Sequence, residues 1–84
     1  MELTQEEELA LEVINAESEK SESRTVYRPY AVRVILNSLR GKSPEYLFYS
    51  SASIERLINN LISLGKLIPV SYDFPKGGYI QPVE

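Results

Sequence analysis

The segment from Ser53 to Leu64 constrains the fold more strongly than any other part of the chain. Its apolar residues recur at spacings of three and four, which predicts an amphipathic α-helix with one buried face. These apolar residues are Ile54, Leu57, Ile58, Leu61, Ile62 and Leu64. Ser51 or Ser53 is predicted to cap the start of the helix, and Gly65 occupies the position at which such a helix ends.

The composition narrows the possible functions of this single small domain, which covers residues 1–84. The chain has no cysteine, so neither a disulfide nor a zinc thiolate can form. It has no histidine, the commonest metal ligand and general base. We therefore expect a protein that is not an enzyme, holds no metal or cofactor, and acts by binding. No apolar run approaches the ~20 residues of a membrane span, so we expect no membrane contact and a cytoplasmic location.

Charge is distributed unevenly along the chain, whose net charge is −3. Residues 1–23 carry eight glutamates and one lysine, a net charge of −7, whereas residues 24–84 carry a net charge of +4. Such a division is typical of a basic binding surface joined to an acidic segment. The alternative is that glutamates favour the start of a helix and that the remaining charges are ordinary solvated surface.

The first 28 residues are predicted to form an acidic helix and a linker. Thr4 and Glu7 have the spacing of a capping box, and apolar residues follow at helical spacing, which predicts a helix over 4–17. Residues 18–24 contain no apolar side chain, so 18–28 is predicted to be a linker. Within it, residues 25–27 are predicted to be extended, because the chain then reaches Pro29.

Two further helices are predicted before the one at 53–64. Pro29 suits a first helical turn and Gly41 a helix end, which predicts a helix over 29–40. Its β-branched residues leave a strand as the competing structure. Ser43 and Pro44 then open a short helix over 43–49, whose aromatic and leucine side chains are expected to fill the core.

The C-terminal residues are predicted to form a two-stranded β-hairpin. Residues 67–72 and 79–83 have strand composition, and 73–78 between them have turn composition. Pro69 and Pro82 cannot donate a backbone hydrogen bond, so each is expected at an outward-facing edge position. The fold class is therefore mainly α with a C-terminal β-hairpin.

This order of elements resembles the winged helix-turn-helix family. The residues that carry the resemblance are Ile35, Leu36 and Leu39, the run 53–68 with its Leu64-Gly65-Lys66-Leu67 ending, and residues 77–80. The resemblance covers roughly residues 29–83 and implies three core helices plus a wing. The acidic helix 4–17 is either an addition to this body or the first of its three core helices.

The resemblance implies a transcription regulator that reads duplex DNA with helix 53–64 and the hairpin. Arginine and asparagine pair with guanine and adenine, and lysine with phosphate. The expected DNA-binding residues are Ser51, Ser53, Arg56, Asn59, Asn60, Ser63, Lys76, Gly77, Arg33, Arg40 and Lys42, with Arg28 as a further phosphate contact. Glu55, in the middle of this surface, would repel phosphate.

Two other interactions remain open from the sequence. The chain has six tyrosines, more than a small core buries comfortably, which suits a protein–protein interaction module such as an adaptor or an inhibitor of the type carried by phages and mobile elements. The acidic helix could also form a homodimer through Leu9, Val13 and Ala16, lie on the core of its own chain, or imitate the charge of a nucleic acid toward another protein.

Overall fold

Three α-helices and a small antiparallel sheet make up the part of the chain that the computed structural model describes, residues 3–70 and 78–83. The helices are α1 (Gln5–Glu19), α2 (Arg28–Lys42) and α3 (Ser51–Ser63), with a short 3₁₀ helix, η1 (Pro44–Phe48), between the last two. The strands are β1 (Val26–Tyr27), β2 (Leu67–Val70) and β3 (Tyr79–Pro82). The predicted mainly helical fold class is confirmed.

The capping box that starts α1 is present as predicted. The Glu7 N–H donates to Thr4 Oγ1 at 3.1 Å, and the Thr4 N–H donates to Glu7 Oε1 at 2.9 Å. The helix continues to Glu19, two residues beyond the predicted end. Ser18 is fully buried there, and its hydroxyl donates to the Asn15 carbonyl oxygen at 2.8 Å, so this small polar residue extends the buried stripe.

The segment predicted as a linker, residues 18–28, is structured at both ends. It contains the last residues of α1, the strand β1 and the first residue of α2, so a turn over residues 20–25 is all that connects the helix to the strand. The predicted extended conformation at Val26–Tyr27 is confirmed, because these two residues pair with β3.

Helix α2 is confirmed as a helix rather than a strand, but Gly41 does not end it. The helix includes Gly41 and continues to Lys42, and Ser43 follows in an extended conformation. The end is set instead by Pro44, since a residue before proline is disfavoured in the helical region.

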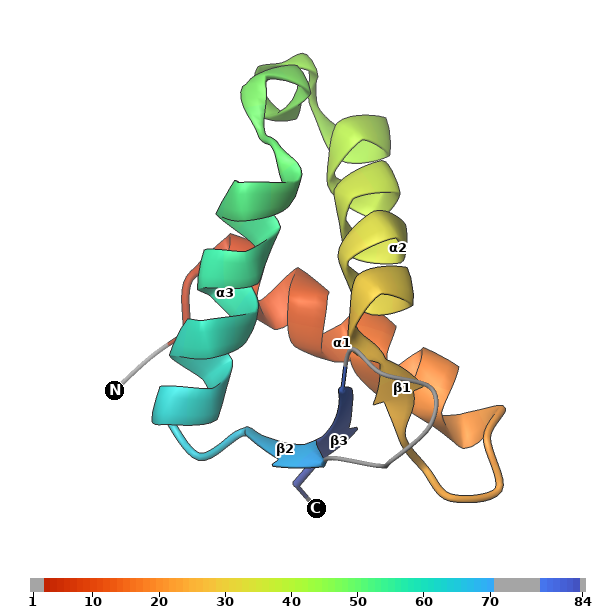
Figure 1. Ribbon diagram of the computed structural model, residues 1–84. Helices are drawn as coiled ribbons and strands as arrows, with labels where there is room; N and C mark the ends of the chain where they lie inside the picture. Colours follow the sequence, from red (N-terminus) through yellow and green to blue (C-terminus); the bar gives the residue numbers. More distant parts are fainter. Residues whose placement is uncertain (1–2, 71–77, 84) are drawn as a thin grey trace.

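The predicted short helix after α2 exists as η1, but its side chains do not fill the core as expected. Tyr46 is buried, whereas the exposed fractions of Leu47 and Phe48 are 62% and 91%. A 3₁₀ helix has three residues per turn, so a five-residue one turns only part of its side chains toward the core. At the top of Figure 1, η1 lies at the opposite end of the molecule from the sheet.

Helix α3 has the predicted period and end, but its cap lies one residue before Ser51 and three before Ser53, the two predicted caps. Ser50 is the N-cap residue, and its N–H donates to Ser53 Oγ at 3.2 Å. At the other end the Lys66 N–H donates to the Leu61 carbonyl oxygen at 2.9 Å and the Gly65 N–H to that of Ile62 at 3.0 Å. This is a Schellman motif, and it requires the positive φ of 77° at Gly65.

The sheet has three strands in the order β1-β3-β2, so the predicted two-stranded hairpin was incomplete. Pro69 lies on the edge strand β2, as expected. Pro82 lies at the end of the central strand β3 and is buried, not on an outer edge. Strand β1 pairs with Tyr79 and Ile80 but does not extend as far as Pro82. The missing N–H of Pro82 therefore costs no hydrogen bond to β1.

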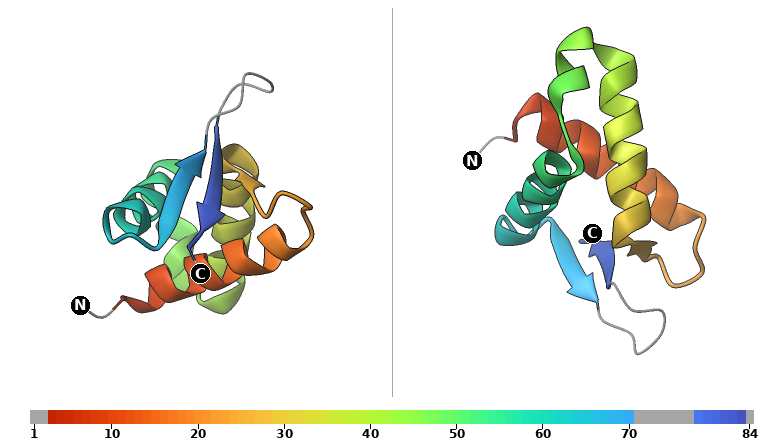
Figure 2. Two further views of the ribbon diagram at one scale, coloured as in Figure 1. Left: turned by 90° about the horizontal axis from the view of Figure 1, so that it is seen from below. Right: turned by 45° about the horizontal axis from the view of Figure 1, so that its top comes forward.

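The core lies where the three helices and the inner face of the sheet meet. Its fully buried side chains include Ile14 of α1, Ile35 of α2, Ile58 of α3 and Ile80 of β3. Figure 1 shows α1 crossing behind α2 and α3, and the left view of Figure 2 shows the sheet across the end of the helices. The acidic helix α1 therefore packs on the core of its own chain.

Candidate nucleic-acid interface

Helix α3 presents one polar stripe to solvent. Arg56, Asn59, Asn60 and Ser63 are all exposed, whereas Ile54, Ile58 and Leu61 on the opposite side are fully buried. The spacing of the four polar residues places them along one side of the helix. The rigid attachment of the apolar face to the core fixes the direction in which this stripe points.

The two predicted serines at the start of α3 differ in their surroundings. Ser51 is exposed, whereas Ser53 is partly buried and its Oγ accepts the hydrogen bond from the Ser50 backbone. The Ser53 side chain is therefore engaged in capping the helix, and Ser51 is the more available of the two for an external partner.

Arg28, at the start of α2, contacts two residues of α3, Glu55 and Asn59. No local pattern in the sequence predicts these contacts. Arg28 Nη2 lies 2.7 Å from Glu55 Oε2, and Arg28 Nε donates to the same oxygen at 2.8 Å. Nη2 also donates to Asn59 Oδ1 at 2.7 Å. The Arg28 guanidinium therefore offsets the predicted repulsion between Glu55 and phosphate. The Asn59 side-chain oxygen already accepts one hydrogen bond, from Arg28.

Three of the remaining predicted cations, Arg33, Arg40 and Lys42, lie on α2. Arg33 is exposed, and Arg40 donates through Nη2 to the Tyr49 carbonyl oxygen at 3.1 Å, just before α3. Lys42 lies beside α1, where it lines a groove with acidic residues, rather than beside the stripe of α3. Lys76 and Gly77 lie outside the described residues.

The acidic side chains of α1 lie away from α3. Glu8, Glu12 and Glu19 are exposed along the outer side of α1, while Ala10 and Ile14 on its inner side are fully buried. Glu8 and Glu12 line a groove between α1 and the end of α2, and α1 crosses behind α2 and α3 in Figure 1. The strongly negative part of the sequence is thus separated from the polar stripe of α3.

A hydrogen bond between distant segments fixes η1 to the start of α1. The Tyr46 hydroxyl donates to Glu6 Oε1 at 3.0 Å, across 40 residues of sequence. The pKa of Glu6 is lowered, first by its own backbone N–H and then by the Tyr46 hydroxyl. The pKa of Tyr46 is raised, chiefly because its hydroxyl proton is held by that carboxylate.

The tyrosines are largely accounted for by packing within the chain. The rings of Tyr27 and Tyr79 lie 5.3 Å apart, and those of Tyr46 and Tyr49 lie 5.1 Å apart at 89° to each other. Tyr30 is the one described tyrosine classed as exposed. Tyrosine content alone therefore gives weaker support to a protein interface than the sequence suggested.

Across residues 3–70 and 78–83, no cluster of three or more acidic residues could hold a metal ion, and no helix is long and apolar enough to cross a membrane. Comparison with protein-family models, with curated proteins and with solved structures finds no match to this chain.

Proposed function

We propose that this chain is a non-catalytic winged-helix domain that binds duplex DNA and regulates transcription. The observation that carries the proposal is the polar stripe of α3, with Arg56, Asn59 and Asn60 exposed on a helix whose other face is fixed in the core. Arginine and asparagine are the residues best suited to guanine and adenine edges in the major groove. A helix of this kind fits that groove.

The order of elements supports the same proposal. A helix, a short helix and an amphipathic helix lead through Gly65 directly into β2, and β3 returns antiparallel to it. This arrangement resembles the winged helix-turn-helix family, with α3 as the recognition helix and the β2–β3 hairpin as the wing. The packing of α1 on α2 and α3 gives the three core helices that the family resemblance implies.

Two features of charge also favour DNA. Glu8 and Glu12 of α1 line a groove with α2 and do not belong to the stripe of α3, so they oppose phosphate at that surface less than a carboxylate within it would. Glu55 is the one carboxylate on α3, and its ion pair with Arg28 reduces its repulsion of phosphate. Arg56 and Asn60 are then the residues expected to contact bases, with Ser63 beside them and Ser51 at the N-terminal end of the helix.

Electrophoretic retardation of a pool of duplex DNA by the intact protein tests the proposal. We expect a retarded complex in low salt and a steep loss of affinity as salt rises, because each neutralised phosphate releases counterions. Arg56→Ala is expected to weaken binding about ten-fold or more and to broaden the selected sequences. Lys20→Ala, at the residue that follows α1, removes the same charge from an exposed site and is expected to change affinity less than about two-fold.

Two outcomes contradict DNA binding by α3. One is the absence of any retarded complex at low salt with well-folded protein. The other is an equal loss of affinity in Arg56→Ala and Lys20→Ala, which would show attraction to net charge without a defined surface.

A further inference from the structure

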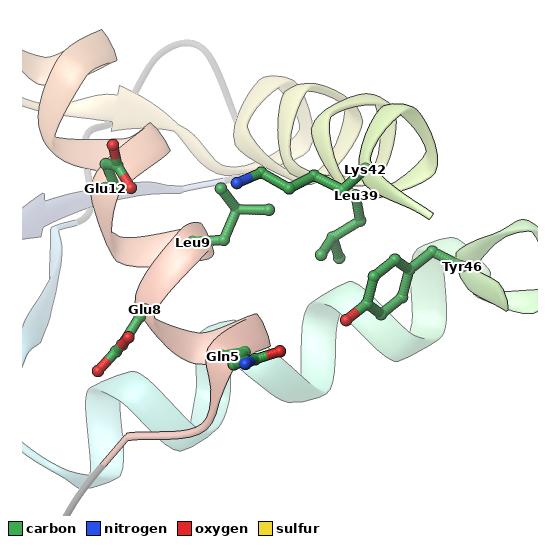
Figure 3. Close-up of a pocket in the computed structure, with 7 residues that line it drawn as sticks. All are labelled: Gln5, Glu8, Leu9, Glu12, Leu39, Lys42 and Tyr46. Carbon is green, nitrogen blue, oxygen red and sulfur yellow. The ribbon is translucent and has the colours of Figure 1, made fainter. Parts of the chain in front are cut away.

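A groove runs between α1 and the end of α2, apart from the polar stripe of α3. Its volume is about 320 Å³, and Figure 3 shows the side chains that line it. Leu9 of α1 and Leu39 of α2 form an apolar floor, with Leu39 almost fully buried and Leu9 partly exposed. Tyr46 of η1 closes one end. An apolar side chain entering the groove would therefore meet apolar surface at its base.

The α1 side of the groove is acidic. Glu8 and Glu12 both line it and are exposed one helical turn apart. Glu19 continues the same side of α1 beyond the groove. Lys42, from α2, is the cation among the lining residues. The excess of carboxylates favours a ligand that places positive charge along α1.

An exposed apolar tip lies next to the groove. Leu47 and Phe48 directly follow Tyr46 on η1, and their exposed fractions are 62% and 91%. Large apolar side chains exposed to this degree next to each other commonly mark interaction surfaces. Together with the groove floor they place apolar surface beside the acidic wall.

We propose that this groove and the Leu47–Phe48 tip form a second binding surface for a cationic, amphipathic segment of another protein. The lysines or arginines of such a segment would lie along Glu8 and Glu12, and its apolar side chains would enter the groove and cover Phe48. The charge of the wall selects this occupant over two others. Phosphates of a nucleic acid would be repelled by the carboxylates, and a second copy of the chain would bring the same acidic wall against itself.

This surface does not depend on the proposed DNA-binding function. The groove lies between α1 and α2, whereas the polar stripe belongs to the side of α3 that faces away from the core. A partner on the groove and DNA on α3 could therefore bind to the same molecule. Variants in the groove are expected to leave DNA retardation unchanged.

Titration of the ¹⁵N-labelled intact protein with a short synthetic peptide tests the proposal by NMR. The probe is a helical peptide of lysine and leucine, and its matched control replaces each lysine by glutamate. We expect the lysine peptide to shift the amide signals of Leu9, Leu39 and Tyr46, and the glutamate peptide to leave them unchanged. Equal binding of both peptides, or shifts confined to residues outside the groove and tip, would overturn the proposal.

Substitutions of exposed residues give the quantitative test. Glu8→Gln combined with Glu12→Gln is expected to weaken the lysine peptide about five-fold or more, since two exposed charge contacts are lost. Phe48→Ala is expected to weaken it by a similar factor, and Lys42→Ala to strengthen it slightly. Glu19→Gln, which removes the same charge outside the groove, is expected to change affinity less than about two-fold. A loss in Glu19→Gln as large as in the double variant, or no loss in Phe48→Ala, would contradict the proposed surface.

Discussion

Two glycines with opposite roles provide a sharp test of how α2 and α3 end. Gly65 follows α3 with φ at 77°, in the left-handed region, whereas Gly41 lies within the last turn of α2. A Cβ added at either position would meet nothing within 4 Å. The effect of alanine at each site is therefore set by the backbone and not by a steric clash.

The expected magnitudes have opposite signs. Gly65→Ala forces an L-residue into the left-handed region, which costs roughly 1–2 kcal/mol, partly offset by the lower entropy of the unfolded chain. We expect a net loss of about 1 kcal/mol in the free energy of unfolding, or about 4–8 °C in melting temperature for a domain of this size. Gly41→Ala replaces glycine in a helix and is expected to stabilise the protein by about 0.5 kcal/mol.

Thermal unfolding followed by circular dichroism at 222 nm measures both variants against the parent protein. A double variant is expected to show the sum of the two effects, because the glycines belong to different helix ends. A destabilisation by Gly41→Ala comparable to that by Gly65→Ala would refute the reasoning. Such a result would mean that α2 ends at Gly41, as predicted from the sequence, and not at Lys42, just before Ser43 and Pro44.

The remaining predictions concern the core, a pH-dependent bond and an ion pair. Ile58→Ala is expected to cost about 2–5 kcal/mol in urea unfolding because its side chain is fully buried, whereas Phe48→Ala is expected to stay within about 0.5 kcal/mol; an equal loss would place Phe48 in the core. Tyr46→Phe is expected to lower the melting temperature at pH 7. The pKa of Glu6 is lowered from its ordinary 4.5, so the stabilisation by the Tyr46–Glu6 hydrogen bond is present above pH 4.5. It is lost as the pH falls through the folded-state pKa of Glu6. The difference in melting temperature between variant and parent is therefore expected to shrink in acid. Arg28→Ala is expected to cost about 0.5–1 kcal/mol in low salt and less in 1 M salt, and a loss independent of salt would contradict an electrostatic role.

The candidate interface was partly predictable from sequence. The polar stripe of α3 follows from the same period that identifies its apolar face, so Arg56, Asn59 and Asn60 could be assigned to one side in advance. Arg28 was expected as a phosphate contact, but its pairing with Glu55 could not be predicted, since the two residues lie 27 positions apart and no local pattern joins them. Lys42 was grouped with the other cations by charge alone, and only the packing of α1 against α2 shows that it lines a different groove.

Features that depend on neighbours within one or two helical turns could be predicted from the amino-acid sequence. The Thr4–Glu7 capping box, the period of α3 and its end at Gly65 are of this kind, because their hydrogen bonds and spacings span only a few residues. The extended conformation of Val26–Tyr27 is not of this kind, because Arg28, the immediate neighbour of Pro29, is already helical and the pairing with β3 holds these two residues extended.

How those elements share a limited core depends on contacts between segments far apart in the sequence. Apolar composition could not show that Tyr46 would be buried while Leu47 and Phe48 stayed in solvent, because exposure depends on where η1 meets α1 and α2. The joining of β1 to the sheet and the packing of α1 on its own chain are likewise contacts between residues far apart in sequence. Such contacts form only when all the elements bury their apolar faces together, and they separated the acidic side of the molecule from the polar stripe of α3.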